Sequence, residues 1–115
     1  MRLNGVSDTI TINVIETIEH NYTYILSSVS IPDTEIKLNQ TKIYTAYKYD
    51  NGIVVAQTFT FSANGDSTAY ILTTVDGNSC TLKCLKSGYN IILSAIDNSD
   101  ESKITTKTIS LKTIF

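Results

Sequence analysis

The chain has 115 residues, with 9 basic and 11 acidic side chains and a formal net charge of -2. Its lysines are scattered singly, which argues against nucleic acid as a partner, because neutralising phosphates requires clustered Lys and Arg. No apolar run approaches the roughly 18 to 20 residues needed to cross a bilayer. We therefore expect one domain with a buried core, and neither a nucleic-acid nor a membrane partner.

The composition favours strands. Threonine and isoleucine are the most abundant residues, and the chain contains 7 Tyr but 1 Pro and no Trp. β-branched and aromatic side chains fit a pleated, half-buried surface and lose rotamer freedom in a helix. No window has the sustained i, i+3, i+4, i+7 apolar spacing of an amphipathic helix. The chain is therefore predicted to be all-β.

Strand patterns recur about every ten residues, with turn residues between them, as in a sandwich or barrel. Strands are expected over residues 8–16, 21–30, 34–38, 41–49, 53–62, 67–75, 79–85, 89–97 and 103–115. Residues 20–115 thus predict an immunoglobulin-like β-sandwich of seven to eight strands in two antiparallel sheets. Residues 1–19 are surplus to it, and are either an extra edge strand or, as we prefer, the end of a preceding domain.

Turn signals and alternation predict which side chains point inward. Asn51-Gly52 lies between two β-rich segments, the strongest short-range signal of a hairpin tip, and a second hairpin is expected at residues 76–78. The expected inward sets are Val55, Phe59 and Phe61; Ile91, Leu93 and Ala95; and Ile109, Leu111 and Phe115. In residues 41–49 the pattern leaves the inward face open. Ile104 is out of phase with its strand and predicts a bulge.

The two cysteines, Cys80 and Cys84, are candidates for a disulfide or a metal site. In a strand they share a face but lie about 13 Å apart, whereas a disulfide needs Cα atoms within about 7 Å. The single histidine, His20, is far away in the sequence. Both cysteines are therefore predicted to be buried, reduced core thiols, which fits assembly in a reducing cytosol.

Three other groups are candidate sites. His20 has no nucleophile or orienting carboxylate fixed near it, as catalysis would require, and is interpreted as a linker residue. The segment DNSDES, residues 97–102, offers oxygen ligands for calcium but lacks the spacing of a calcium loop, so we expect a solvated turn. Alternate tyrosines share a strand face, Tyr22 with Tyr24 and Tyr47 with Tyr49, and fit the core equally well; only exposed pairs would support sugar binding. We predict no catalytic, cofactor or metal residues and no enzyme activity.

A family resemblance adds to this reading. Residues 31–65, IPDTEIKLNQTKIYTAYKYDNGIVVAQTFTFSANG, and residues 75–99, VDGNSCTLKCLKSGYNIILSAIDNS, resemble bacterial immunoglobulin-like domains of group 2 (Big_2-like). The matching features are Tyr-Thr-Ala before the Asp-Asn-Gly tip, an aromatic-bearing strand, and the Cys80 to Tyr89 segment. The resemblance covers about residues 24–112, with Phe where the family often has Trp. Such modules recur in intimin- and invasin-type adhesins and are appended to tailed-phage virion proteins.

The resemblance implies a non-catalytic structural or adhesion module of a phage or prophage virion protein, in the tail, neck or capsid. Its implied partners are other virion proteins and, weakly, host-surface carbohydrate. The implied location is the virion, assembled in the bacterial cytoplasm. One alternative is a bacterial cell-surface adhesin domain, and another is a dedicated carbohydrate-binding module. No secretion signal is visible at the N-terminus, which favours the phage setting.

Overall fold

The computed structural model describes residues 19–114, and these form nine strands and no helix. Alternation of buried apolar residues with exposed ones, as in β6 and β9, gives these strands one face for the core and one for solvent. The strands are β2 (Tyr22–Ser27), β3 (Glu35–Lys37), β4 (Thr41–Asp50), β5 (Ile53–Val55), β6 (Phe59–Asn64), β7 (Tyr70–Asp76), β8 (Ser79–Cys84), β9 (Tyr89–Asp97) and β10 (Ile104–Lys112). The predicted all-β class is confirmed.

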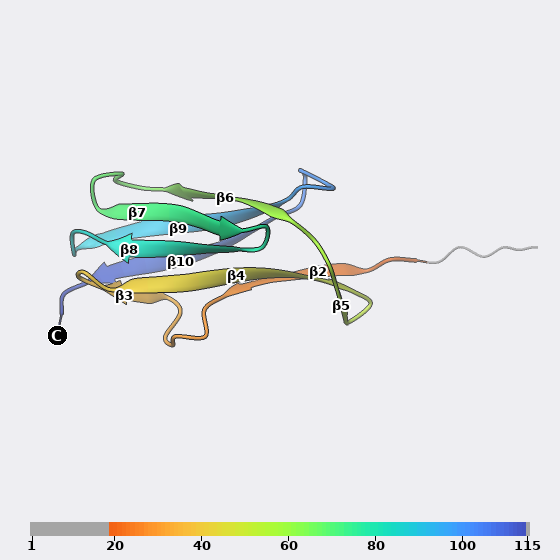
Figure 1. Ribbon diagram of the computed structural model, residues 1–115, viewed down its shortest axis with the longest axis horizontal. Helices are drawn as coiled ribbons and strands as arrows, with labels where there is room; N and C mark the ends of the chain where they lie inside the picture. Colours follow the sequence, from red (N-terminus) through yellow and green to blue (C-terminus); the bar gives the residue numbers. More distant parts are fainter. Residues whose placement is uncertain (1–18, 115) are drawn as a thin grey trace, which may run out of the picture.

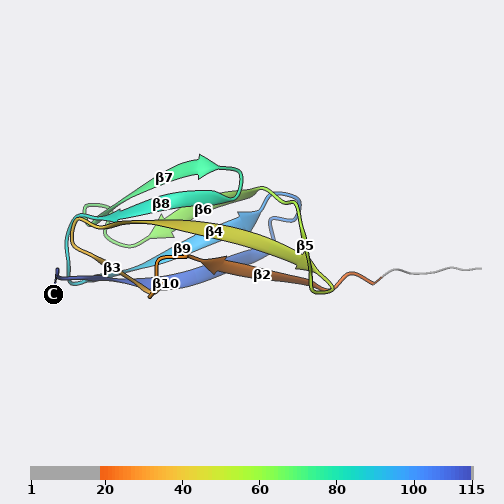
Figure 2. The ribbon, with the colours of Figure 1, turned by 60° about the horizontal axis from the view of Figure 1, so that its bottom comes forward.

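The strands form two sheets packed face to face (Figures 1 and 2). One sheet has the order β2-β4-β8-β7, with β5 paired to β4, and the other has the order β3-β10-β9-β6. When the short β3 and β5 are left out, the remaining seven strands can be lettered A to G in chain order. The two sheets then have the orders ABED (β2-β4-β8-β7) and GFC (β10-β9-β6), as in immunoglobulin domains. The sandwich therefore has the strand order of an immunoglobulin fold.

One pairing departs from the predicted antiparallel sheets. β3 runs parallel to β10, with Ile36 opposite Leu111, while every other pair of described strands is antiparallel. The chain crosses from β2 in one sheet to β3 in the other through the segment that contains Pro32. Pro32 lacks an N–H for a ladder hydrogen bond, which fits its place between strands.

The expected strand over residues 53–62 is two strands. β5 pairs with β4 in the first sheet, and β6 pairs with β9 in the second. The connection Ala56–Thr58 carries the chain from one sheet to the other (Figure 1). Phe59 and Phe61 are buried as predicted, whereas Val55 is half-buried on the other sheet. Because Val55, Phe59 and Phe61 are all separated by even numbers of residues, the alternation pattern did not show that the chain changes sheets between them.

Most other sequence predictions agree with the structure. Asn51 and Gly52 have positive φ values of 51° and 84° in a two-residue hairpin between Asp50 and Ile53. The inward sets of β9 and of the end of β10 are buried; Phe115 lies outside the described residues. On β4 the inward residues are Lys42, Tyr44, Ala46 and Lys48.

The bulge predicted at Ile104 is wrong. β10 pairs with β9 in unbroken register from Ile104 to Leu111, and Ile104 simply points outward, 53% exposed. The register shift lies instead in β7, between Thr74 and Asp76. The question of what residues 1–18 form falls outside the described part of the chain.

The described chain enters and leaves at opposite ends of the long axis (Figure 1). At the entry end, the Asn51 side-chain amide donates to the Glu19 carbonyl at 2.9 Å. At the exit end, Leu38 donates its N–H to the Lys112 carbonyl at 2.9 Å. The ten-residue β4 runs between these ends, so they are separated by about 30 Å.

Candidate functional site

Cys80 and Cys84 lie in the core. Both are free thiols with no exposed surface, on the inward face of β8 with Leu82 between them. Burial raises the pKa of the Cys80 thiol to about 12 and raises that of Cys84 above its usual value. Both sulfurs are therefore protonated at neutral pH and unsuited to nucleophilic or metal chemistry. The prediction of buried core thiols is confirmed.

The segment DNSDES is not uniformly a solvated turn, as the sequence had suggested. Asp97 is the last residue of β9 and is completely buried, because it shares the inward face with Leu93 and Ala95. Its Oδ2 lies 2.7 Å from Nζ of Lys48, whose side chain is 8% exposed. Lys48 is on β4 of the other sheet, so this ion pair joins the two sheets.

The Asp97 carboxylate is surrounded by donors. The Tyr24 hydroxyl donates to Oδ2 at 2.6 Å, and the backbone N–H and hydroxyl of Ser99 donate to Oδ1 at 2.8 and 2.7 Å. Burial alone raises the pKa of this carboxyl, but the hydrogen bonds from Lys48, Tyr24 and Ser99 outweigh burial and hold the pKa well below its usual range. Burial and the neighbouring carboxylate raise the pKa of Tyr24. Asp97 is therefore a fixed anion, not a proton donor.

The Lys48 ammonium is also fully engaged. It donates to Oε1 of Gln57 at 3.3 Å and to the Ser99 hydroxyl at 3.2 Å. The ring of Tyr22 lies 4.3 Å from Nζ, a cation–π distance. With every polar atom occupied, this cluster stabilises the sandwich and offers no reactive group to a substrate.

His20 lies at the entry end, beside this cluster. Its Nδ1 is 2.6 Å from Oδ2 of Asp50, and its ring stacks on Tyr22 with centroids 5.4 Å apart. Asp50 Oδ1 is buried without a hydrogen-bond partner among the described residues. The structure therefore places a carboxylate beside His20, which the sequence did not predict, and these contacts fix the chain where it enters the sandwich.

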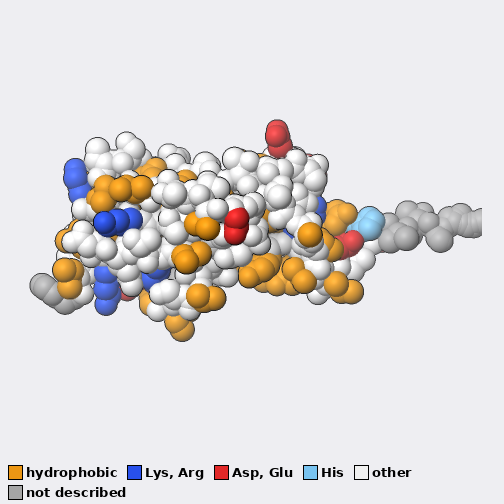
Figure 3. Space-filling model, viewed as in Figure 1, with side chains coloured by type: hydrophobic (Ala, Val, Ile, Leu, Met, Phe, Trp, Pro, Cys, Tyr) orange, Lys and Arg blue, Asp and Glu red, His pale blue; other side chains and the backbone are white. Residues whose placement is uncertain are grey.

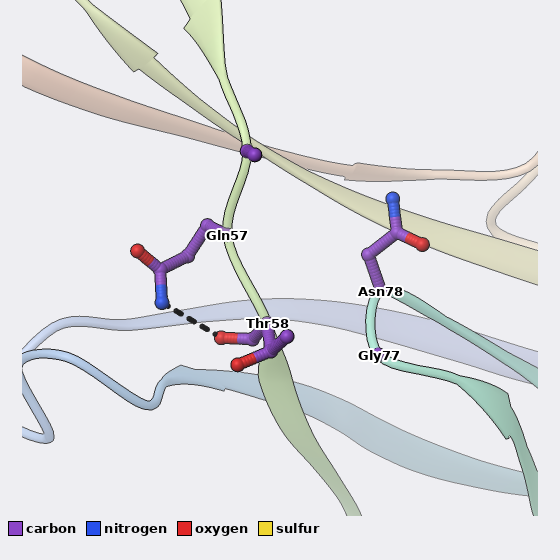
Figure 4. Close-up of a pocket in the computed structure, with 5 residues that line it drawn as sticks. Gln57, Thr58, Gly77 and Asn78 are labelled. Carbon is purple, nitrogen blue, oxygen red and sulfur yellow. Dashed lines mark hydrogen bonds between the residues drawn. The ribbon is translucent and has the colours of Figure 1, made fainter.

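A shallow hollow of about 470 Å³ lies between the β5–β6 connection and the β7–β8 turn. Its walls are Ala56, Gln57, Thr58, Gly77 and Asn78 (Figure 4). The Gln57 amide is held by a hydrogen bond to the Thr58 carbonyl at 3.0 Å. The approach of Gly77 to Thr58 is close, since a Cβ on the glycine would lie 2.9 Å from Thr58 Cγ2. The hollow is open, and none of the residues that line it is charged.

Two tyrosines, one exposed and one half-buried, form a pair on the outer face of β4. Tyr47 and Tyr49 have ring centroids 6.5 Å apart, and Tyr47 is 40% exposed. In register they lie opposite Ile25 and Thr23 of β2, and Tyr49 also lies opposite Val54 of β5. Figure 3 shows hydrophobic side chains gathered over β2 and β5 at this end. We call these five residues the tyrosine platform; the sequence indicated its aromatic pair but not its apolar surround.

Comparison of the chain with known proteins identifies no related protein. The chain has no significant match to a family model, a curated protein or a solved structure. The immunoglobulin-like description therefore depends on the strand order given above. The resemblance to the group 2 family remains a resemblance.

Two further findings concern residues 19–114. No three His, Cys, Asp or Glu side chains in this range are grouped closely enough to hold a metal ion. No helix in the described chain is long and apolar enough to span a membrane. Sequence reasoning missed the buried structural ion pair of Lys48 and Asp97. The sequence did contain a signal for the burial of Asp97, because this residue continues the alternation of the buried Ile91, Leu93 and Ala95.

Proposed function

We propose that this chain is a non-catalytic, immunoglobulin-like structural and adhesion module of a phage or prophage virion protein. The observation that carries the proposal is that the described chain enters and leaves the sandwich at opposite ends (Figure 1), about 30 Å apart by the length of β4. A domain entered at one end and left at the other adds its length to whatever it links. It therefore serves as a spacer that extends a surface structure.

The internal contacts support this role. The Lys48–Asp97 pair ties the sheets together near the entry end, and Tyr44 donates a hydrogen bond to the Asp33 carbonyl at 2.7 Å further along. Contacts of this kind resist separation of the sheets when force is applied along the chain. The alternative setting, a bacterial cell-surface adhesin, makes the same mechanical demand and shares the resemblance.

The two settings are separated by locating the protein. Antibodies raised against the purified chain would be used for immunogold electron microscopy of phage particles and of cell envelopes, both prepared from the source strain. We expect gold on the particles. Gold on the envelope would replace the phage setting with the adhesin setting. Antigen found only in the soluble fraction, with both other fractions unlabelled, would overturn both.

The tyrosine platform favours a second candidate function, the binding of neutral carbohydrate. The aromatic faces of Tyr47 and Tyr49 suit stacking against the apolar faces of sugar rings, and Thr23 adds a hydroxyl. None of the five platform residues is charged, which favours neutral over acidic sugars.

The test is binding of chitopentaose, laminarin and dextran, followed by tyrosine fluorescence. A matched control is available, because Tyr89 is a single tyrosine with 38% exposure against 40% for Tyr47. We expect the Tyr47→Ala/Tyr49→Ala variant to lose binding and the Tyr89→Ala variant to keep it. Equal loss in both variants, or no binding of any probe by the wild type, would rule out this candidate.

A further inference from the structure

Apart from Lys112 at the exit end, the outer face of the β6, β9 and β10 strands carries no charged residue. Its outward positions alternate with the buried set and run from Thr60 to Asn64, from Asn90 to Ile96 and from Ile104 to Ser110. All are Thr, Ser, Asn or Ile. Ile92 and Ile104 are exposed there by 42% and 53%. Exposed sheet surfaces normally carry many Lys and Glu, whereas depletion of charge marks the centre of protein interfaces.

This face is also the more regular of the two. The β9–β10 and β6–β9 registers are unbroken over their full lengths. The opposite face of the sandwich has the register shift at Thr74 and contains Lys83. A regular, uncharged sheet presents the flatter surface for packing against another sheet.

The two ends of the face carry opposite excess charge. At the exit end, Lys112 and Lys37 lie opposite each other in register, with Glu35 nearby on the same edge. At the other end, the β9–β10 turn carries Asp100 and Glu101 with Lys103. A copy of the same face turned end for end would therefore bring the lysine-rich end of each chain to the acidic end of the other.

We propose that this β6–β9–β10 face binds the same face of a second copy of the chain, with the strands of the two copies running antiparallel across a two-fold axis. An uncharged centre avoids self-repulsion, and the charged ends select the antiparallel orientation. The three strands β6, β9 and β10, of six, nine and nine residues, offer about 400 Å² of flat area per copy. The total of about 800 Å² is below that of a stable specific interface, so the contact is weak in solution and gains strength where several copies are held together.

The first test is sedimentation velocity of the full chain over a range of concentrations. Thr106→Glu places a charge in the middle of the proposed interface, and Thr73→Glu makes the same change at an exposed strand position on the opposite face. We expect concentration-dependent dimers in the wild type and in Thr73→Glu. Thr106→Glu should raise the dissociation constant at least about tenfold, because like charges then meet near the axis.

The second test addresses orientation. Lys112→Glu and Glu101→Lys each place like charges at the meeting ends and should weaken self-association. A mixture of the two variants should restore association, because each pair of ends is complementary again. A monomeric wild type at every concentration, equal effects of Thr73→Glu and Thr106→Glu, or no rescue in the mixture would overturn the proposal.

Discussion

Nζ of Lys48 lies 2.7 Å from Oδ2 of Asp97 and links β4 of one sheet to β9 of the other. The side chains are 8% and 0% exposed, so neither charge is solvated. A buried charge without its partner is costly, while the intact pair contributes little compared with a well-packed apolar pair. The contact therefore makes the fold sensitive to loss of either residue.

Asp97→Asn is expected to lower the free energy of unfolding by about 3–5 kcal/mol, because it leaves the Lys48 ammonium buried and unpaired. Lys48→Met should have a similar effect by leaving the carboxylate unpaired. Urea denaturation at pH 7 measures both values. A loss below about 1 kcal/mol for Asp97→Asn would show that the pair is solvated or displaced in solution.

A matched pair of residues provides the control. Lys107 and Asp33 are 2.8 Å apart but 20% and 24% exposed, so Lys107→Met is expected to cost only about 0–1 kcal/mol. The double variant Lys48→Met/Asp97→Leu removes both buried charges and should cost less than the sum of the two single losses. Simple additivity would mean that the two residues do not interact.

Acid is expected to destabilise the domain through Asp97. The carboxyl has a lowered pKa in the folded state and a value near 3.8 when unfolded. Its contribution is therefore present above about pH 4 and is lost as pH falls below that value. The free energy of unfolding should fall from pH 5 to pH 2, more steeply in wild type than in Asp97→Asn. Part of the slope remains in the variant, because Asp33, Asp66, Asp76 and Asp100 also have lowered pKa values. If the free energy of unfolding fell equally steeply with pH in both proteins, Asp97 would not contribute to the acid sensitivity.

Local patterns were enough to predict much of the fold. Ile91, Leu93 and Ala95 alternate without interruption, and a strand with one buried face must place them inward. Asn51-Gly52 was readable because few other dipeptides adopt two positive φ values at low cost.

The remaining features depend on distant partners. β5 and β6 have the same parity, so alternation cannot show that the chain changes sheets at Ala56–Thr58. The parallel pairing of Ile36 with Leu111 depends on segments far apart in the sequence. The Lys48–Asp97 pair required a choice between the two faces of β4, which carries two lysines among its inward residues. The burial of Lys48 is explained only when the other sheet supplies the Asp97 carboxylate.

The thiols are expected to be unreactive in the folded protein. Cys80 and Cys84 have no exposed surface, and burial raises both pKa values. Ellman's reagent at pH 8 should label neither cysteine until guanidinium is added, and then label both. Because the folded pKa of Cys80 is about 12 against 9.0 unfolded, its contribution to stability is full below pH 9 and is lost as pH rises toward 12. Rapid labelling of the native protein would contradict its place in the core.

Gly65→Ala is expected to destabilise the domain more than Gly88→Ala. Both glycines have positive φ values, 151° and 90°, so both substitutions strain the backbone. At Gly65 the added Cβ would also lie 2.8 Å from Ile91 Cγ2 and 3.2 Å from the Asn90 carbonyl oxygen, whereas at Gly88 nothing lies within 4 Å. Since Ile91 is fully buried on the central strand β9, it has little room to move, and the extra overpacking should cost about 1–3 kcal/mol. Urea denaturation of the two variants measures the difference directly. Equal losses would mean that the turn before β7 moves away from β9 when the methyl group is added.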